Sequence, residues 1–147
     1  MRIIDYEQSH LHELMDGPLN NGAPEHIGYM RAYAEELQQP GWSFTLIENG
    51  HIICCAGIVD MWPGVGEAWF LASNKIHEYP RPFIRFAKTD VIEKVVDEND
   101  LWRVQAVCKA DWAAAIKFAQ FLGFQSEGIM RKYGPEGADY LRVAWIR

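Results

Sequence analysis

The chain has 147 residues, 49% of them hydrophobic, with six tryptophans and a formal net charge of −6 at pH 7. This length and composition predict one globular domain over residues 1–147 and exclude an intrinsically disordered chain. The negative charge argues against a protein that binds nucleic acid through a general positive field. A local basic pocket for an anionic cofactor is still compatible with it.

The first ten residues, MRIIDYEQSH, include charged residues within an apolar patch, which is not the pattern of a signal peptide. No apolar run approaches about 18 residues, so we expect no membrane-spanning helix. Cys54, Cys55 and Cys108 lie in strand-like runs and are interpreted as reduced, buried packing residues rather than a catalytic thiol. These features predict a cytoplasmic location.

Residues 2–6 predict a short first strand. Ser9 is placed to cap a helix that ends near Met15, before Gly17. Pro24 suits the first position of a second helix. Four apolar residues at helical spacing would form the buried face of that helix: Ile27, Met30, Ala34 and Leu37.

The segment WSFTLIENGHIICCAGIVDMW contains the clearest local signal. Two β-rich runs flank Asn49-Gly50, a dipeptide that supplies the positive φ angles of a two-residue hairpin turn. After Pro63-Gly64, the residues GEAWFLAS predict a further strand that is partly or wholly buried.

Residues 72–90, ASNKIHEYPRPFIRFAKTD, join that strand to a helix predicted from about Pro82 to Val96. A loop that meets a helix N-terminus is a natural phosphate site, because N–H groups converge there and the helix dipole favours negative charge. Glycine usually permits the close approach of the ligand. This loop has no glycine but carries Lys75, Arg81 and Arg85.

The C-terminal part begins with a strand, LWRVQAVC. Asp111 is placed to cap the following helix, WAAAIKFAQFL, and Gly123 stands where a left-handed residue ends it. FQSEGIMRKY, a turn at GPEGAD and YLRVAWIR predict a second hairpin. The predicted order, β-α-α-β-β-β-α-β-α-β-β, is that of an α/β domain with a mixed sheet.

Element order and C-terminal motifs resemble the GNAT acyltransferases, the family that moves an acetyl group from acetyl-CoA to an amine. The motifs are Ala115, Leu122-Gly123-Phe124, Glu127-Gly128, Arg131 and Gly137-Ala138-Asp139. With the strand WFLAS and the missing glycine loop, they are most similar to small GNAT-like proteins of tailed bacteriophages, some of them internal virion proteins. The resemblance covers nearly the whole chain in element order, with motifs from about residue 65. It implies a single-domain GNAT fold with a mixed, mostly antiparallel sheet of about six or seven strands, flanked by about four helices.

In most GNATs the loop after the fourth strand reads Gln/Arg-x-x-Gly-x-Gly/Ala, and its amides hold the pyrophosphate of CoA. If Arg81 takes the first position, Ile84 and Phe86 replace the glycines; if Pro82 does, Arg85 and Ala87 stand in the later positions. Neither register restores the motif. Arg81 and Arg85 either hold the phosphates through charge-assisted hydrogen bonds or are surface residues on a degenerate loop.

The family geometry also implies roles in pantetheine binding and catalysis. The main chain of three strand residues would pair with the pantetheine arm, and two residues at the last helix start would flank it: Phe70, Leu71 and Ala72, then Asp111 and Trp112. Glu67, early in the fourth strand, resembles the position of a base that strips a proton from the amine. Many members use a Tyr as the acid for the departing thiolate where this chain has Ala119. The acid is therefore either missing or supplied elsewhere, by Tyr133 or by water.

Two functions follow from the resemblance. The first is an N-acetyltransferase that uses acetyl-CoA and acts on a primary amine of a small molecule or a protein. The alternative is a GNAT-shaped phage virion or host-interaction protein without chemistry, favoured by the glycine-free loop and Ala119. We expect no nucleic-acid or membrane partner, a location in the host cytoplasm or the virion if phage-encoded, and a homodimer if the apolar strand YLRVAWIR pairs with a second copy.

A metal site is not expected. His10 and His12 flank Leu11, and on a helix their side chains would diverge by about 200°. We interpret both as surface histidines.

Overall fold

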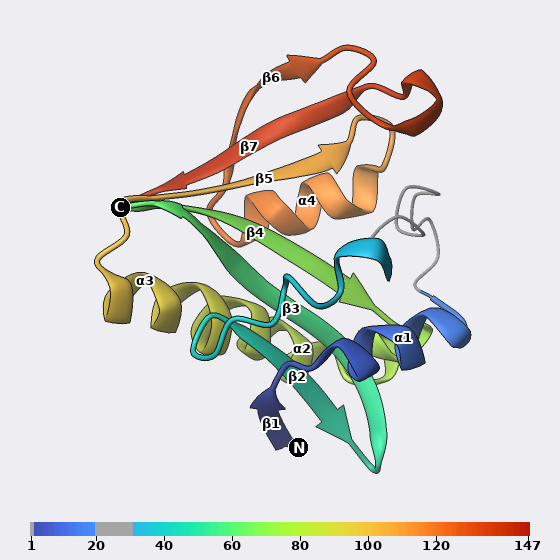
Figure 1. The fold of residues 1–147 in the computed structure, drawn as a ribbon. Coiled ribbons are helices and arrows are strands. Elements are labelled where there is room, and N and C mark those ends of the chain that lie inside the picture. Colours follow the sequence, from blue (N-terminus) through green and yellow to red (C-terminus); the bar gives the residue numbers. More distant parts are fainter. Residues whose placement is uncertain (1, 20–30) are drawn as a thin grey trace.

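The computed structural model describes residues 2–19 and 31–147 (Figure 1). Within these residues the strands form a seven-stranded sheet in the order β1-β2-β3-β4-β5-β7-β6. The strands are β1 (Arg2–Asp5), β2 (Ser43–Glu48), β3 (His51–Trp62), β4 (Val65–Ala72), β5 (Arg103–Lys109), β6 (Gln125–Met130) and β7 (Tyr140–Ile146). All neighbours are antiparallel except β4 and β5, which are parallel. The predicted mixed, mostly antiparallel sheet of an α/β domain is confirmed.

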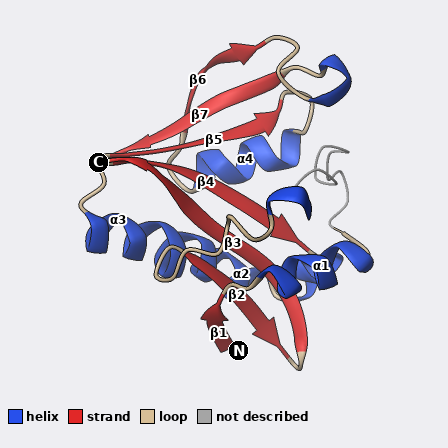
Figure 2. Cartoon of the chain, in the orientation of Figure 1, coloured by secondary structure: helices blue, strands red, loops and turns tan. Residues whose placement is uncertain are grey.

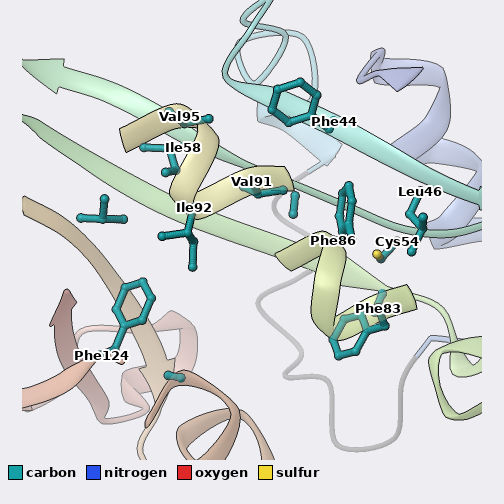
Figure 3. Packing of buried hydrophobic residues seen from close by; sticks show 14 of the residues in the cluster. Phe44, Leu46, Cys54, Ile58, Phe83, Phe86, Val91, Ile92, Val95 and Phe124 are labelled. Carbon is teal, nitrogen blue, oxygen red and sulfur yellow. The ribbon is translucent and has the colours of Figure 1, made fainter. Parts of the chain in front are cut away.

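Helices cover the two faces of the sheet (Figure 2). They are α1 (Gln8–Asp16), α2 (Pro80–Arg85), α3 (Lys94–Asn99) and α4 (Ala113–Phe121). Helix α1 packs on one face of β3 and β4, where Leu11, Leu14 and Leu71 are buried together. The other helices enclose the larger core on the opposite face, where Ile58, Val91, Ile92 and Val95 pack between helix and strands (Figure 3). Buried apolar area of this kind is the main stabilising term of such a fold.

Strands β4 and β5 separate soon after they pair. Their ladder has three paired positions, which join Val65 to Arg103, Gly66 to Val104 and Glu67 to Gln105. Beyond this point the two strands diverge, and the sheet opens as a wedge (Figure 1). The sheet therefore consists of two halves, β1–β4 and β5–β7–β6, joined by a short parallel ladder.

The predicted first hairpin is confirmed. Asn49 and Gly50 both have positive φ angles, 49° and 77°, and Ile47 pairs with Ile52 on either side of the turn. This is the two-residue turn whose twist matches that of the flanking strands. The turn is determined by Asn49 and Gly50 themselves, so its formation does not depend on packing elsewhere in the fold.

The predicted cap of the first helix was wrong. Helix α1 begins at Gln8 with Glu7 as its N-cap, not at Ser9. The Glu7 carboxylate accepts from the backbone N–H of His10, and the Glu7 N–H donates to His10 Nδ1 (3.2 Å). His10 therefore takes the place that glutamate or glutamine normally has in a capping box.

His10 is half-buried rather than a free surface histidine, which corrects the expectation made for it. Its Nδ1 lies 2.8 Å from the hydroxyl of Thr45, a buried residue of β2. That hydroxyl in turn lies 3.4 Å from the thiol of Cys55 on β3. The polar chain ties the start of α1 to the sheet.

The second predicted helix is only partly testable, because Pro24, Ile27 and Met30 lie outside the described residues. Over its described part the expectation was wrong, since residues 31–33 form a 3-10 turn and irregular turns follow. The carbonyl of Ala34 accepts from the Tyr6 hydroxyl (2.9 Å), so a side chain just after β1 holds this segment. Ala34 itself is buried, as predicted.

The helix after β4 starts and runs differently from the prediction. It begins at Pro80 rather than Pro82, and α2 continues into α3 through a π-helical segment, Phe86–Glu93. Buried residues explain the wide turn: Phe86 and Ala87 are followed five residues later by Val91 and Ile92. A five-residue spacing suits the i→i+5 bonding of a π-helix, so both pairs can face the sheet.

At the last helix the predicted end is confirmed and the predicted cap is wrong. Gly123 has a φ of +100° just after α4. The N-cap is Trp112 rather than Asp111, and no side chain caps the helix. Asp111 instead lies 3.9 Å from the ammonium of Lys109. The two residues sit in the turn that leaves β5.

The three cysteines are free thiols, as expected; Cys54 and Cys55 are buried as predicted, whereas Cys108 is only half-buried. Burial raises the pKa of the Cys55 thiol to about 12, which suits a packing residue rather than a nucleophile. None of the helices in the described part of the chain is long and apolar enough to cross a bilayer.

Candidate functional site

The edge of β4 that faces the opened wedge is the first part of the site. Ala72, Leu71 and Phe70 pair with β3 through Cys54, Cys55 and Ala56 on one edge. On the other edge, the ladder to β5 stops at Glu67, so no described strand pairs with these residues. An extended ligand could take hydrogen bonds from such an edge, as a peptide does in β-augmentation.

Two cations lie at the start of the helix that follows this strand. Arg81 and Arg85 are exposed, and neither forms an ion pair with a described residue. They are four residues apart on α2, so their side chains lie on the same face of the helix. Guanidinium groups in this arrangement can bind phosphate oxygens in bidentate fashion.

The main chain at the same helix start is a poor anion site. Pro80 and Pro82 have no N–H, and the N–H of Phe83 donates to the carbonyl of Tyr79 (3.1 Å). Of the first turn, only the N–H of Arg81 remains as a backbone donor. Sequence reasoning noticed the missing glycines, but the two prolines remove the amides themselves.

An aromatic cluster bridges α2 and α4 across the wedge. The rings of Phe83 on α2 and Phe118 on α4 stack with centroids 4.9 Å apart, and Phe70 on β4 lies 5.2 Å from Phe83 and 6.0 Å from Phe118. Phe83 is buried. The side chain of Phe70 thus faces the helices, while its main chain borders the open edge.

Glu67 stands at the point where β4 and β5 part. Its Oε1 accepts from Gln105 Nε2 on β5 (3.1 Å) and from Arg142 Nη1 on β7 (2.5 Å). The Glu67 and Arg142 side chains are 29% and 22% exposed. Glu67 is therefore no solitary carboxylate, but its Oε2 accepts no hydrogen bond from any described residue.

A second ion pair continues this network. Arg103 donates both Nη atoms to the Glu127 carboxylate (2.9 and 2.6 Å) and its Nε to Gln105 Oε1 (3.0 Å). The Arg103 guanidinium holds the pKa of Glu127 below its usual range. We call Glu67, Gln105, Arg142, Arg103 and Glu127 the wedge network.

Tyr133 lies at the other end of the same face of β7. Its exposed ring packs on Tyr140, with the two ring centroids 5.5 Å apart. Tyr140 precedes Arg142 by two residues on β7. Burial, with Tyr133 and Asp111 nearby, raises the pKa of Tyr140 to about 12. The structure gives no direct contact between Tyr133 and Glu67 among the described residues.

Two tryptophans near the wedge have indole N–H groups that are buried without a partner among the described residues. They are Nε1 of Trp69 and Nε1 of Trp112. Trp69 follows Glu67 by two residues on the same face of β4 and packs edge-on against Tyr6, with centroids 5.0 Å apart. A buried unpaired donor is costly and calls for an explanation.

Sequence reasoning found Glu67 but missed its partners. A signal existed, because polar residues alternate along the strand LWRVQAVC at Arg103 and Gln105, which places both on one face. Nothing in the sequence told which strand would lie beside them, so the pairing with Glu67 and Arg142 could not be inferred.

The residues present fit an acyl-CoA in part. The open edge of β4 suits an extended arm with amide groups, and the free guanidiniums of Arg81 and Arg85 suit its phosphates. The prolines at the helix start do not suit a pyrophosphate held by backbone amides. Binding here would depend on arginine side chains.

No family model and no curated protein sequence matches the chain. Solved structures do match over nearly its whole length. A ribosomal-protein-alanine N-acetyltransferase from Brucella melitensis has a TM-score of 0.72 at 15% identity, with both chains fully covered. An aminoglycoside 6′-acetyltransferase type Ii has a TM-score of 0.75 at 15% identity, covering 99% of this chain and 97% of its own.

A third match is a Salmonella typhimurium protein described as an acetyltransferase and solved with its cofactor acetyl-CoA. It has a TM-score of 0.70 at 16% identity, covering 99% of this chain and 93% of its own. Identities this low show the fold, and the chain has the GNAT fold. The three proteins named here are not described as phage proteins, so the resemblance to phage-encoded members stays a prediction.

Proposed function

We propose that the protein is an acetyl-CoA-dependent N-acetyltransferase that acts on a primary amine. The observation that carries the proposal is the open edge of β4 between Glu67 and the unpaired Arg81 and Arg85. The fold shared with three structures described as acetyltransferases, one of them solved with acetyl-CoA, supports it. Acetyl-CoA, when bound, supplies the thioester whose acetyl carbon the amine attacks.

Each residue of the site has a role in this proposal. The main chain of Phe70, Leu71 and Ala72 binds the pantetheine arm, and Arg81 and Arg85 bind the phosphates in place of the missing amides. Asp111 and Trp112, at the start of α4, flank the arm. The indole N–H of Trp112 is buried without a partner among the described residues, so the ring would contact the arm through its apolar surface.

Glu67 is the proposed base. Its Oε2 has no described partner and takes the proton that the ammonium group must lose before its nitrogen can form the new C–N bond. As the C–S bond breaks, the nitrogen would lose its second proton to water, and the sulfur would take a proton from Tyr133, which solvent then reprotonates, or from water. Arg142 and Gln105 hold the carboxylate in place through Oε1.

The test is a calorimetric titration of acetyl-CoA, with CoA for comparison, into the wild-type chain and into Arg81→Ala and Arg85→Ala. We expect micromolar binding, weakened at least tenfold (about 1.4 kcal/mol) by either substitution. Arg2→Ala is the matched control, because it removes the same charge on the outermost strand β1. No heat up to millimolar ligand from a folded protein would end the enzyme proposal.

The alternative is a non-catalytic virion or host-interaction protein with the same fold. Two observations favour it: the prolines remove backbone donors at the helix start, and Phe83 stacks on Phe118 across the wedge. Pro82→Ala separates the two functions, because it restores one N–H in the first turn. If the phosphates bind there, this substitution raises the affinity for acetyl-CoA, whereas a chain without a cofactor site shows no binding before or after it.

A further inference from the structure

The wedge network alternates in charge across four strands, β4, β5, β7 and β6. Glu67 on β4 meets Arg142 on β7, and Arg103 on β5 meets Glu127 on β6, with Gln105 bonded to both pairs. The network lies on the face of β4 that also carries Trp69 and Leu71, the face on which α1 packs. All four charged side chains are partly exposed, so a ligand can reach them.

Hydrogen-bonding capacity is left over at one of the two pairs. Both oxygens of Glu127 are taken by Arg103. At the other pair, Oε2 of Glu67 accepts from no described residue, and Nε and Nη2 of Arg142 donate to none. One acceptor oxygen on Glu67 and two donor nitrogens on Arg142 therefore lie side by side, because the two side chains form an ion pair.

A ligand of one charge does not suit this site. A polycation would satisfy Glu67 but would stand next to Arg142 and Arg103, and a simple anion would stand next to Glu67 and Glu127. Like charges within a few ångströms oppose binding, the more so where water is partly excluded. A ligand that carries both charges a few bonds apart meets an opposite charge at each end.

Trp69 follows Glu67 by two residues on the same face of β4 and packs on Tyr6. Its indole N–H is buried and has no partner among the described residues. Because this nitrogen is enclosed by the protein, it is not a contact for the ligand. Its place on the strand beside Glu67 makes it a reporter of binding at the network.

We propose that the acceptor is a small zwitterion, a molecule with a primary ammonium group and a carboxylate a few bonds apart. Its ammonium binds Oε2 of Glu67, the atom that then takes the proton, and its carboxylate binds Nε and Nη2 of Arg142. This inference rests on the proposed acetyltransferase function and narrows its acceptor to amino acids. Diamines and aminoglycoside-like polycations are excluded as preferred acceptors.

The test compares matched acceptors in acetyl transfer. Glycine, β-alanine, 4-aminobutyrate and 6-aminohexanoate are each set against their own carboxamide, with rates corrected for the fraction of unprotonated amine, and 1,4-diaminobutane is added. We expect at least one acid to exceed its carboxamide by tenfold or more in kcat/KM. A carboxamide or the diamine as the best acceptor would overturn the proposal.

Variants locate the effect. Arg142→Gln should bring the acid-to-carboxamide ratio close to one, and Arg142→Lys, which keeps the ion pair with Glu67, should lower it in part. Arg2→Gln, the same change on β1, should leave the ratio unaltered. A ratio that survives Arg142→Gln in a folded protein would contradict the assignment.

A binding measurement separates this inference from the proposed function. Nitrogen-15 NMR of the indole N–H of Trp69, assigned through Trp69→Phe, is followed while each amino acid is added without acetyl-CoA. If acetyl-CoA does not bind at all, the proposed function fails. A saturable shift with an amino acid, lost in Arg142→Gln, would still support the zwitterion site, and no shift at tens of millimolar would overturn it.

Discussion

Gly64, in the turn between β3 and β4, meets two separate constraints. Its φ is +87°, a conformation that costs an L-residue roughly 1–2 kcal/mol. An added Cβ would also lie 2.2 Å from ring atoms of Trp102, which covers the turn. Other residues are excluded here both by the backbone and by a neighbour from the start of β5.

We therefore expect Gly64→Ala to destabilise the fold more than Gly41→Ala. Gly41 has a similar φ of +82°, but no heavy atom of the described residues lies within 4 Å of an added Cβ. Gly41→Ala should cost about 1 kcal/mol, and Gly64→Ala at least about 1 kcal/mol more, because the indole must move. Urea denaturation of both variants measures the difference. Equal losses of stability would show that the Trp102 ring moves aside at no cost.

The buried thiol of Cys55 should make the protein sensitive to alkali. Its pKa is raised from 9.0 to about 12, chiefly by burial, with a raising effect of Glu13 and an opposing hydrogen bond from Thr45. In the unfolded chain the thiol ionises near pH 9, so its contribution to stability is complete below that pH. The contribution is lost as the pH rises from about 9 to about 12.

The free energy of unfolding should fall between pH 9 and 11, by about 1.4 kcal/mol per pH unit for each such group. Cys55→Ala should make this slope shallower by about 1.4 kcal/mol per pH unit, which is the contribution of one titrating group. Denaturant titrations at several pH values measure it. Cys108→Ala, at a half-buried site, should reduce the slope less.

At the scale of elements, α2 and α4 are joined by the stacked rings of Phe83 and Phe118. Phe118→Ala should lower the free energy of unfolding by about 3 kcal/mol, because it removes an aromatic ring from a packed cluster. Phe121 on the same helix is 65% exposed, so Phe121→Ala should stay within about 0.5 kcal/mol. Similar effects of both substitutions in thermal or urea unfolding would mean that the stack adds nothing.

A comparison of the predicted and observed elements shows which features local sequence patterns determine. The order of the strands along the chain, the hairpin at Asn49-Gly50 and the end of α4 at Gly123 were predicted correctly, since each depends on local sequence. Helix starts were not: Glu7 replaced Ser9, Pro80 replaced Pro82 and Trp112 replaced Asp111. Several residues near each start could begin a helix, and packing against the sheet selects among them.

For the molecule as a whole, the joint between the two halves of the sheet is short. The parallel ladder of β4 and β5 ends at Glu67, and the side chains of Glu67 and Arg142 continue the connection to β7. This ion pair spans the place where the backbone connection stops. It should therefore contribute to stability more than an ordinary surface pair.

A double-mutant cycle with Glu67→Gln and Arg142→Gln tests this. We expect a coupling energy of about 1 kcal/mol, since the pair is mostly shielded and shares Gln105. The control is Asp16 with Arg31, a pair whose side chains are 75% and 45% exposed. Its coupling should not exceed about 0.5 kcal/mol, and equal couplings would show that Glu67 and Arg142 are no special joint.

By itself the sequence determined the α/β class, the strand order along the chain, the reduced cysteines and the loop that lacks glycine. These follow from periodicity, turn residues and composition, which act over a few residues. The candidate base Glu67 also came from position along a strand. Nothing local, however, distinguished a free carboxylate from a paired one.

Only the tertiary structure decided the partners of Glu67. Gln105 is 38 residues away and Arg142 is 75. They meet Glu67 because β5 lies beside β4 and β7 lies beside β5, ahead of β6, in an order that differs from the chain order. The same holds for the stacking of Phe83 on Phe118 and for the π-helical turn, which follows the spacing of buried residues on the sheet. Contacts of this kind depend on which surfaces pack together, and that is a property of the whole fold.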